Sequence, residues 1–105
     1  MQIEILIDGE KKTFVASVVP MLARRKFLEI QAKEEEYLEK HGKIPAKKQI
    51  EFENEIVSIL VDIVFKKQFT AEQLLSGVSD DYFNKKLSEA IFGKVGSEVG
   101  NEQKK

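Results

Sequence analysis

The sequence contains no cysteine, a single histidine and only two prolines among its 105 residues. Without cysteine the chain can form no disulfide, no thiolate nucleophile and no thiolate ligand for a metal, a composition that suits a reducing compartment. The one histidine, His41, lies outside any zinc-type spacing and has no local support for a Ser-His-Asp arrangement. Its place beside Gly42 indicates instead the last turn of a helix, where a positive ring is favourable.

An excess of either charge is also missing. Lysine and arginine number 17 against 18 aspartates and glutamates, which gives a formal charge of -1 and a pI near 5.9. A nucleic-acid-binding domain usually has a basic excess, because neutralisation of phosphates supplies most of its affinity. Arg24, Arg25 and Lys26 form the one tight basic cluster, and pairing with nearby glutamates explains it more simply. We therefore expect no nucleic-acid partner.

Long hydrophobic runs are absent as well. The most apolar stretch, Ile56 to Phe65, covers about 10 residues, whereas a membrane-spanning helix needs roughly 20. The amino terminus shows no basic region followed by an apolar run and a cleavage site, so no secretion signal is visible. These features predict a cytoplasmic protein that does not enter a membrane.

Catalytic and cofactor motifs are not found in the sequence. Glu34, Glu35 and Glu36 are consecutive, so on a helix their carboxylates point in different directions and form a solvated face. Three glycines, Gly93, Gly96 and Gly100, follow no strand and therefore do not resemble a phosphate-binding loop. We predict no catalytic residue, no cofactor site and no metal site, and hence a protein that is not an enzyme.

The length predicts one domain, over residues 1–95. From Gly96 the composition shifts to Gly, Ser, Asn, Gln, Glu and Lys, which cannot bury enough apolar surface to offset the entropy of ordering. Residues 96–105 are therefore expected to be a flexible tail.

The amino-terminal segment predicts a β-hairpin over residues 2–15. Ile3, Ile5 and Ile7 alternate with other residues, and the Asp8-Gly9 pair that follows is a strong signal for a two-residue hairpin turn. Because two strands alone are marginal in water, the isoleucine face should rest on helices or on strands of another copy.

Four helices should follow, over residues of about 20–41, 46–67, 71–76 and 80–93. Pro20 suits a first helical turn, and Gly42 with Pro45 separates the first two helices. Thr70 and Gln73 have the spacing of a capping box, and Gly77 is expected to end the third helix. The fold class is therefore α+β, an amino-terminal hairpin followed by a small bundle of about four helices.

The second helix carries the most informative pattern in the chain. Between Ile56 and Phe65 only Ser58 and Asp62 are polar, so apolar side chains surround nearly the whole helix, and a helix of this kind must be enclosed. A chain of this size has few residues to enclose it, so we expect a partner protein to complete its burial. The candidate partner-binding residues are Phe52, Ile56, Ile59, Ile63, Phe65 and Phe69.

Two stretches carry a resemblance to a known family. The segment IEILIDGEKKTFVASVVP (3–20), then a helical middle, then VDIVFKKQFTAEQLLSGV (61–78) resembles the small tail assembly chaperones of long-tailed bacteriophages and prophages. A motif like Phe65-x-x-Gln68-Phe69-Thr70-x-x-x-Leu74-Leu75 joins two helices in such proteins. The resemblance covers most of residues 3–92, and its motifs are structural and not catalytic.

The resemblance implies a virus-encoded, non-enzymatic protein in the bacterial cytoplasm. Its partners would be the tape measure protein, a long helix-forming chain that it keeps soluble, and the tail tube subunits that polymerise around that chain. Self-association into a homo-oligomer, with lateral contacts at the hairpin edge, would give avidity along one long client. Two alternatives stay open: a small structural or connector protein of the tail, and a helical interaction or regulatory module that binds DNA through Arg24, Arg25 and Lys26.

Overall fold

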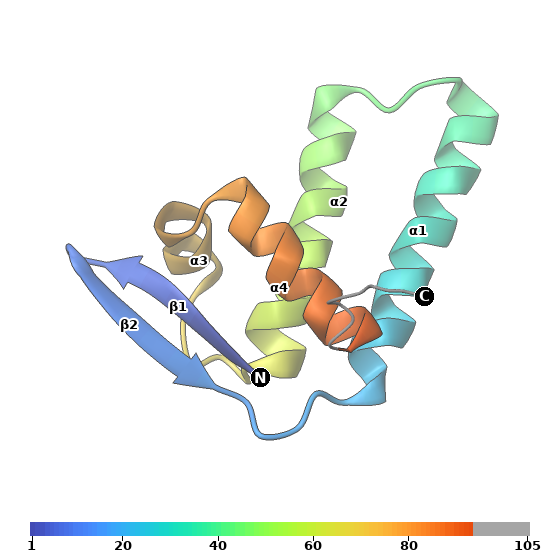
Figure 1. Ribbon diagram of the computed structural model, residues 1–105. Helices are drawn as coiled ribbons and strands as arrows, with labels where there is room; N and C mark the ends of the chain where they lie inside the picture. The colour runs from blue at the N-terminus through green and yellow to red at the C-terminus, as the bar shows by residue number, and fades with distance from the viewer. Residues whose placement is uncertain (94–105) are drawn as a thin grey trace, which may run out of the picture.

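The computed structural model describes residues 1–93, and the predicted tail at 96–105 lies outside the described residues. The fold is an antiparallel two-stranded hairpin followed by helices, which confirms the α+β prediction. Two long helices stand side by side, α4 crosses their lower ends, and the hairpin and α3 lie on the left-hand side of the view (Figure 1).

Strands β1 (Gln2–Ile7) and β2 (Glu10–Val15) pair as predicted, with Ile3 opposite Phe14. Asp8 and Gly9 form the turn with φ of 52° and 80°, the conformation that favours an Asp-Gly pair. Ile3 and Ile5 are completely buried. The isoleucine face therefore rests on the helices of the same chain.

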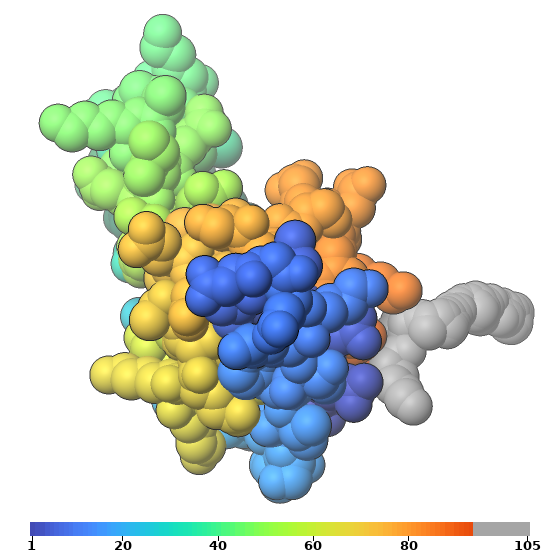
Figure 2. All heavy atoms as spheres, turned by 90° about the vertical axis from the view of Figure 1, so that its left-hand side faces the viewer, coloured from blue at the N-terminus to red at the C-terminus, as the bar shows by residue number. Residues whose placement is uncertain are grey.

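Helices α1 (Met21–His41) and α2 (Ala46–Ser58) form an antiparallel helical hairpin. Gly42 ends α1 in the left-handed conformation, and its N–H donates to the carbonyl of Leu38, as a glycine C-cap does. Lys33 of α1 pairs with Glu55 of α2 at 2.6 Å. The tip of this helical hairpin stands clear of the rest of the molecule (Figure 2).

The segment predicted as the second helix, about 46–67, is helical as far as Val64, but it is not an α-helix throughout. The chain changes at Ile59 into a π-helix, η1 (Ile59–Val64), and the N–H of Phe65 donates to the carbonyl of Leu60 at 2.9 Å. Lys66 and Lys67 then take left-handed φ values of 50° and 64°. These two residues reverse the chain, so that Phe69 returns beneath the hairpin.

Helix α3 (Ala71–Gly77) begins with the predicted capping box. The N–H of Gln73 donates to Thr70 Oγ1 at 3.1 Å, and the N–H of Thr70 donates to Gln73 Oε1 at 2.9 Å. Helix α4 (Asp80–Phe92) has a simpler N-cap, in which the Ser79 hydroxyl accepts from the N–H of Tyr82. These caps satisfy amides that the first turn of a helix leaves unpaired.

The core of the protein is built around η1. Ile59, Leu60 and Phe65 are completely buried, and Val61 and Val64 expose 6% and 1% of their surface. Helices α1, α2 and α4 contact η1 directly, and their buried residues include Ala23, Ile30 and Leu87. The expectation that so short a chain cannot enclose this segment is therefore wrong.

The hairpin is attached to the helices through three aromatic rings. The ring of Phe69 lies between those of Phe14 and Phe65, with centroid distances of 5.0 and 5.3 Å. On the outer edge of β1, the N–H of Glu4 donates to the Tyr82 hydroxyl at 2.9 Å. The hairpin is thus tied both to the end of η1 and to α4.

Candidate partner-binding groove

A groove lies between α2 and α4, with α1 on one side and α3 on the other. It consists of two adjoining cavities of about 410 and 170 Å³. Glu53, Asp80 and Phe83 line both cavities, so the two lie side by side, and they are here called the groove. The residues that line this groove are Glu34, Ala46, Gln49, Ile50, Phe52, Glu53, Ile56, Val57, Leu74, Leu75, Val78, Ser79, Asp80, Phe83, Asn84 and Leu87.

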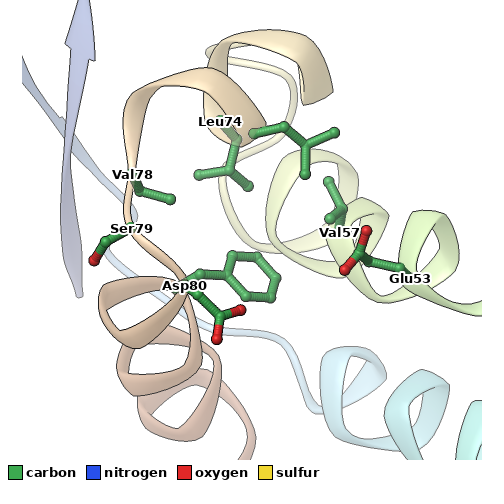
Figure 3. Close-up of a pocket in the computed structure, with 8 residues that line it drawn as sticks. Glu53, Val57, Leu74, Val78, Ser79 and Asp80 are labelled. Carbon is green, nitrogen blue, oxygen red and sulfur yellow. The ribbon is translucent and has the colours of Figure 1, made fainter. Parts of the chain in front are cut away.

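The groove is apolar along its floor, and two large side chains on its walls are accessible. Ile50 of α2 exposes 57% of its surface, and Leu75 of α3 exposes 52%. Phe83 of α4, which lines both cavities, is half-buried. Figure 3 shows Val57, Leu74 and Val78 around the smaller cavity, on α2, on α3 and on the segment before α4. An apolar depression with accessible aliphatic and aromatic walls suits the apolar face of a helix.

Within residues 1–93, all the charged residues that line the groove are acidic. They are Glu34 from α1, Glu53 from α2 and Asp80 from the first turn of α4. In the smaller cavity Glu53 and Asp80 lie on different walls (Figure 3). Among the described residues 1–93, none of these three carboxylates takes part in an ion pair. Asp80 Oδ2 accepts a hydrogen bond of 3.5 Å from Asn84 Nδ2.

The six residues predicted to bind a partner do not share one surface. Phe52 and Ile56 line the groove, although Phe52 exposes only 3% of its surface and Ile56 is half-buried. Ile59 is completely buried, and Ile63 is half-buried against the core. Phe65 and Phe69 lie in the aromatic stack beneath the hairpin. Four of the six, Phe52, Ile59, Phe65 and Phe69, thus belong to the core of the folded chain.

Three residues of the groove, Ile50, Leu75 and Phe83, were not among the partner-binding residues predicted from the sequence. The sequence did predict both helices, over about 46–67 and 80–93. It could not show that α4 diverges enough from α2 to leave Phe83 and Ile50 accessible. Glu34 was assigned to a solvated face, and only the packing of α4 makes it part of the groove.

The other polar residues singled out in the sequence have structural positions. The His41 ring stacks on Tyr37 at a centroid distance of 4.3 Å, in the last turn of α1 as predicted. Arg24 and Arg25 are exposed and take part in no ion pair within the described region, so the local pairing predicted for them is not present. In residues 1–93 there is no group of three His, Cys, Asp or Glu side chains placed to hold a metal ion. None of the helices in this region combines the length and the apolar character needed to cross a membrane.

Comparison with known proteins identifies the family. The model of the family described as phage tail chaperone protein matches residues 1–105, the whole chain. The chain therefore belongs to the phage tail chaperone family, and its role is that of a tail assembly chaperone. No curated protein and no solved structure matches it.

Proposed function

We propose that this tail assembly chaperone binds the tape measure protein of its virus and keeps it soluble while tail tube subunits polymerise around it. Membership of the tail chaperone family supports the general role. The observation that carries the specific proposal is the apolar groove between α2 and α4, which has accessible walls at Ile50 and Leu75. A tape measure protein is a long helix-forming chain, and its apolar helical faces are what such a groove would cover.

The groove supports a binding mode in which the client remains a helix. Its walls are the packed helices α2, α3 and α4, so the site exists before the client arrives and little ordering is needed on binding. One groove offers a contact to a single helix, and we expect binding at any one groove to be weak and reversible. Reversibility is needed because the tube subunits must later replace the chaperone. Of the residues predicted from the sequence, Phe52 and Ile56 would contact the client here.

We also propose that several copies act together on one client and contact each other. Val15, Val18, Met21 and Leu22, at and after the end of β2, are between 57% and 79% exposed. This apolar segment is a better candidate for contact between copies than the hairpin edge, because β2 carries Lys11 and Lys12, and lysines at a sheet edge oppose strand pairing. Many copies on one long client would gain avidity although each contact is weak. The protein would act in this way without catalysis, in the bacterial cytoplasm.

Co-expression tests the proposal. The tape measure protein of the same virus is produced in bacteria with and without the chaperone, and its soluble fraction is measured. We expect soluble tape measure protein only in the presence of the chaperone, recovery of the two together from the lysate, and absence of the chaperone from purified tails. If the soluble fraction is unchanged, or if the chain is a stoichiometric component of finished tails, the proposal is wrong and the connector role is favoured.

A further inference from the structure

We propose that the groove selects among helical segments by charge, and that its client segment is an amphipathic helix whose apolar face is bordered by lysine or arginine. The identification of that segment as part of the tape measure protein rests on the proposed function. The charge requirement itself is inferred from the groove alone.

The charges around the groove are of one sign. Within the described part of the chain, three carboxylates, on α1, α2 and α4, line the groove, and no lysine, arginine or histidine does. The three elements lie around the depression, so a bound helix would meet negative charge on more than one flank. A helix with glutamates beside its apolar face would be repelled, because like charges placed opposite each other across an interface are strongly unfavourable.

As far as the structure describes the chain, the groove carboxylates are not paired with lysines in the free protein, whereas several other glutamates are. Five other glutamates in the described region are paired with lysines: Glu4, Glu36, Glu51, Glu55 and Glu89. Lys33, the immediate neighbour of Glu34, pairs across to Glu55 instead. Lys86, on the same helix as Asp80, pairs with Glu89. Among residues 1–93 the three groove carboxylates take part in no such pair, and neither do Glu35, Glu39 and Asp62, which lie outside the groove.

A structural role within the folded chain accounts for only one of the three acidic residues. Asp80 lies in the first turn of α4, where a negative charge stabilises the helix. Glu34 and Glu53 lie in the middle of their helices, at positions where the helix dipole gives no such benefit. Burial does not explain them either, because Glu53 is exposed and Glu34 is half-buried. The feature that the three carboxylates share is that they line the groove, where a cationic client would meet all of them.

Synthetic helical peptides of about five turns provide the test. Three peptides share one leucine-rich apolar face and carry lysine, glutamine or glutamate at the positions beside it. Their binding to the full chain is measured by fluorescence anisotropy at low and at high salt. We expect the lysine peptide to bind about tenfold more tightly than the glutamine peptide at low salt, with the advantage shrinking as salt screens the charges. The glutamate peptide should bind least.

Two triple variants make the test specific to the groove. E34Q/E53Q/D80N should bind the lysine and glutamine peptides with nearly equal affinity. The control E35Q/E39Q/D62N removes three exposed acids that do not line the groove and take part in no ion pair in the described region, and it should keep the preference for lysine. Thermal unfolding of both variants checks that the fold is retained.

The possible outcomes separate this inference from the proposed function. Equal affinity for all three peptides, or a lysine preference that survives in E34Q/E53Q/D80N, would overturn the charge requirement, whether or not the tape measure protein is bound. A lysine preference that depends on the groove acids would support it, even if co-expression shows that the tape measure protein is not the client.

Discussion

Gly77 lies so close to the backbone of Leu6 that no side chain fits between α3 and β1. A Cβ atom on Gly77 would lie 2.5 Å from the Leu6 carbonyl oxygen and 2.5 Å from Cγ2 of Ile5. Gly77 is the last residue of α3, as its sequence position suggested. The structure adds a second role, since the absence of a side chain allows the helix to approach the strand.

Gly77→Ala is therefore expected to destabilise the protein. In an open helix this change would be favourable by up to about 1 kcal/mol, but here the added methyl group meets backbone atoms that cannot rotate away. We expect a net loss of about 1–3 kcal/mol in the free energy of unfolding, measured by urea denaturation. Ser76→Ala, at an exposed position of the same helix, is the control and should change stability by less than about 0.5 kcal/mol. If the free energy of unfolding of Gly77→Ala equals that of the parent protein, α3 and β1 can move apart at little cost.

The sequence was sufficient to predict the elements whose signals are local. The Asp8-Gly9 turn, the Gly42 cap and the Thr70–Gln73 capping box depend on a few neighbouring residues, and all three are present in the structure. The turn at Lys66 and Lys67 was not predicted, because no glycine or proline marks it, and the contact between Phe65 and Phe69 on its two sides forms only in the folded chain.

The groove could be predicted only in part, because it depends on how the helices pack and not on local signals in the sequence. The apolar pattern of residues 56–65 indicates burial but does not say whether a partner or the same chain supplies the cover. The answer depends on how α1 and α4 cross η1, and that crossing is a tertiary property. The residues that do remain accessible, Ile50 and Leu75 among them, belong to ordinary amphipathic stretches that no local signal distinguishes from a core face.

Substitutions of Phe69 test whether this residue belongs to the core or to a surface that binds a partner. Because it exposes 3% of its surface and contacts both Phe14 and Phe65, Phe69→Ala should cost about 3–5 kcal/mol in the free energy of unfolding. Phe69→Leu keeps most of the volume and should cost much less, and it should leave client binding unchanged. A Phe69→Leu variant that stays folded but no longer binds the tape measure protein would instead place Phe69 in the partner interface.

Substitutions of Lys67 test whether the left-handed backbone conformation strains the turn after η1. Its φ of 64° is rare for residues other than glycine, asparagine and aspartate and is worst for β-branched ones. Lys67→Gly should keep or raise the free energy of unfolding, by up to about 1 kcal/mol, whereas Lys67→Val should lower it by about 1–3 kcal/mol. Chemical denaturation of the two variants beside the parent protein measures both effects. Similar stability for the glycine and valine variants would mean that the turn adopts another conformation in solution.

The central claim is that the groove between α2 and α4 holds the client. The most direct measurement is co-expression of the tape measure protein with Ile50→Gln/Leu75→Gln, a double variant that removes two accessible apolar side chains from the groove. The control is Leu28→Gln/Leu38→Gln, because these leucines expose 50% and 45% of their surface on α1 and do not line the groove. We predict that the groove variant folds but leaves the tape measure protein insoluble, while the control variant keeps it soluble. Full solubility with the groove variant would contradict the assignment of the client site.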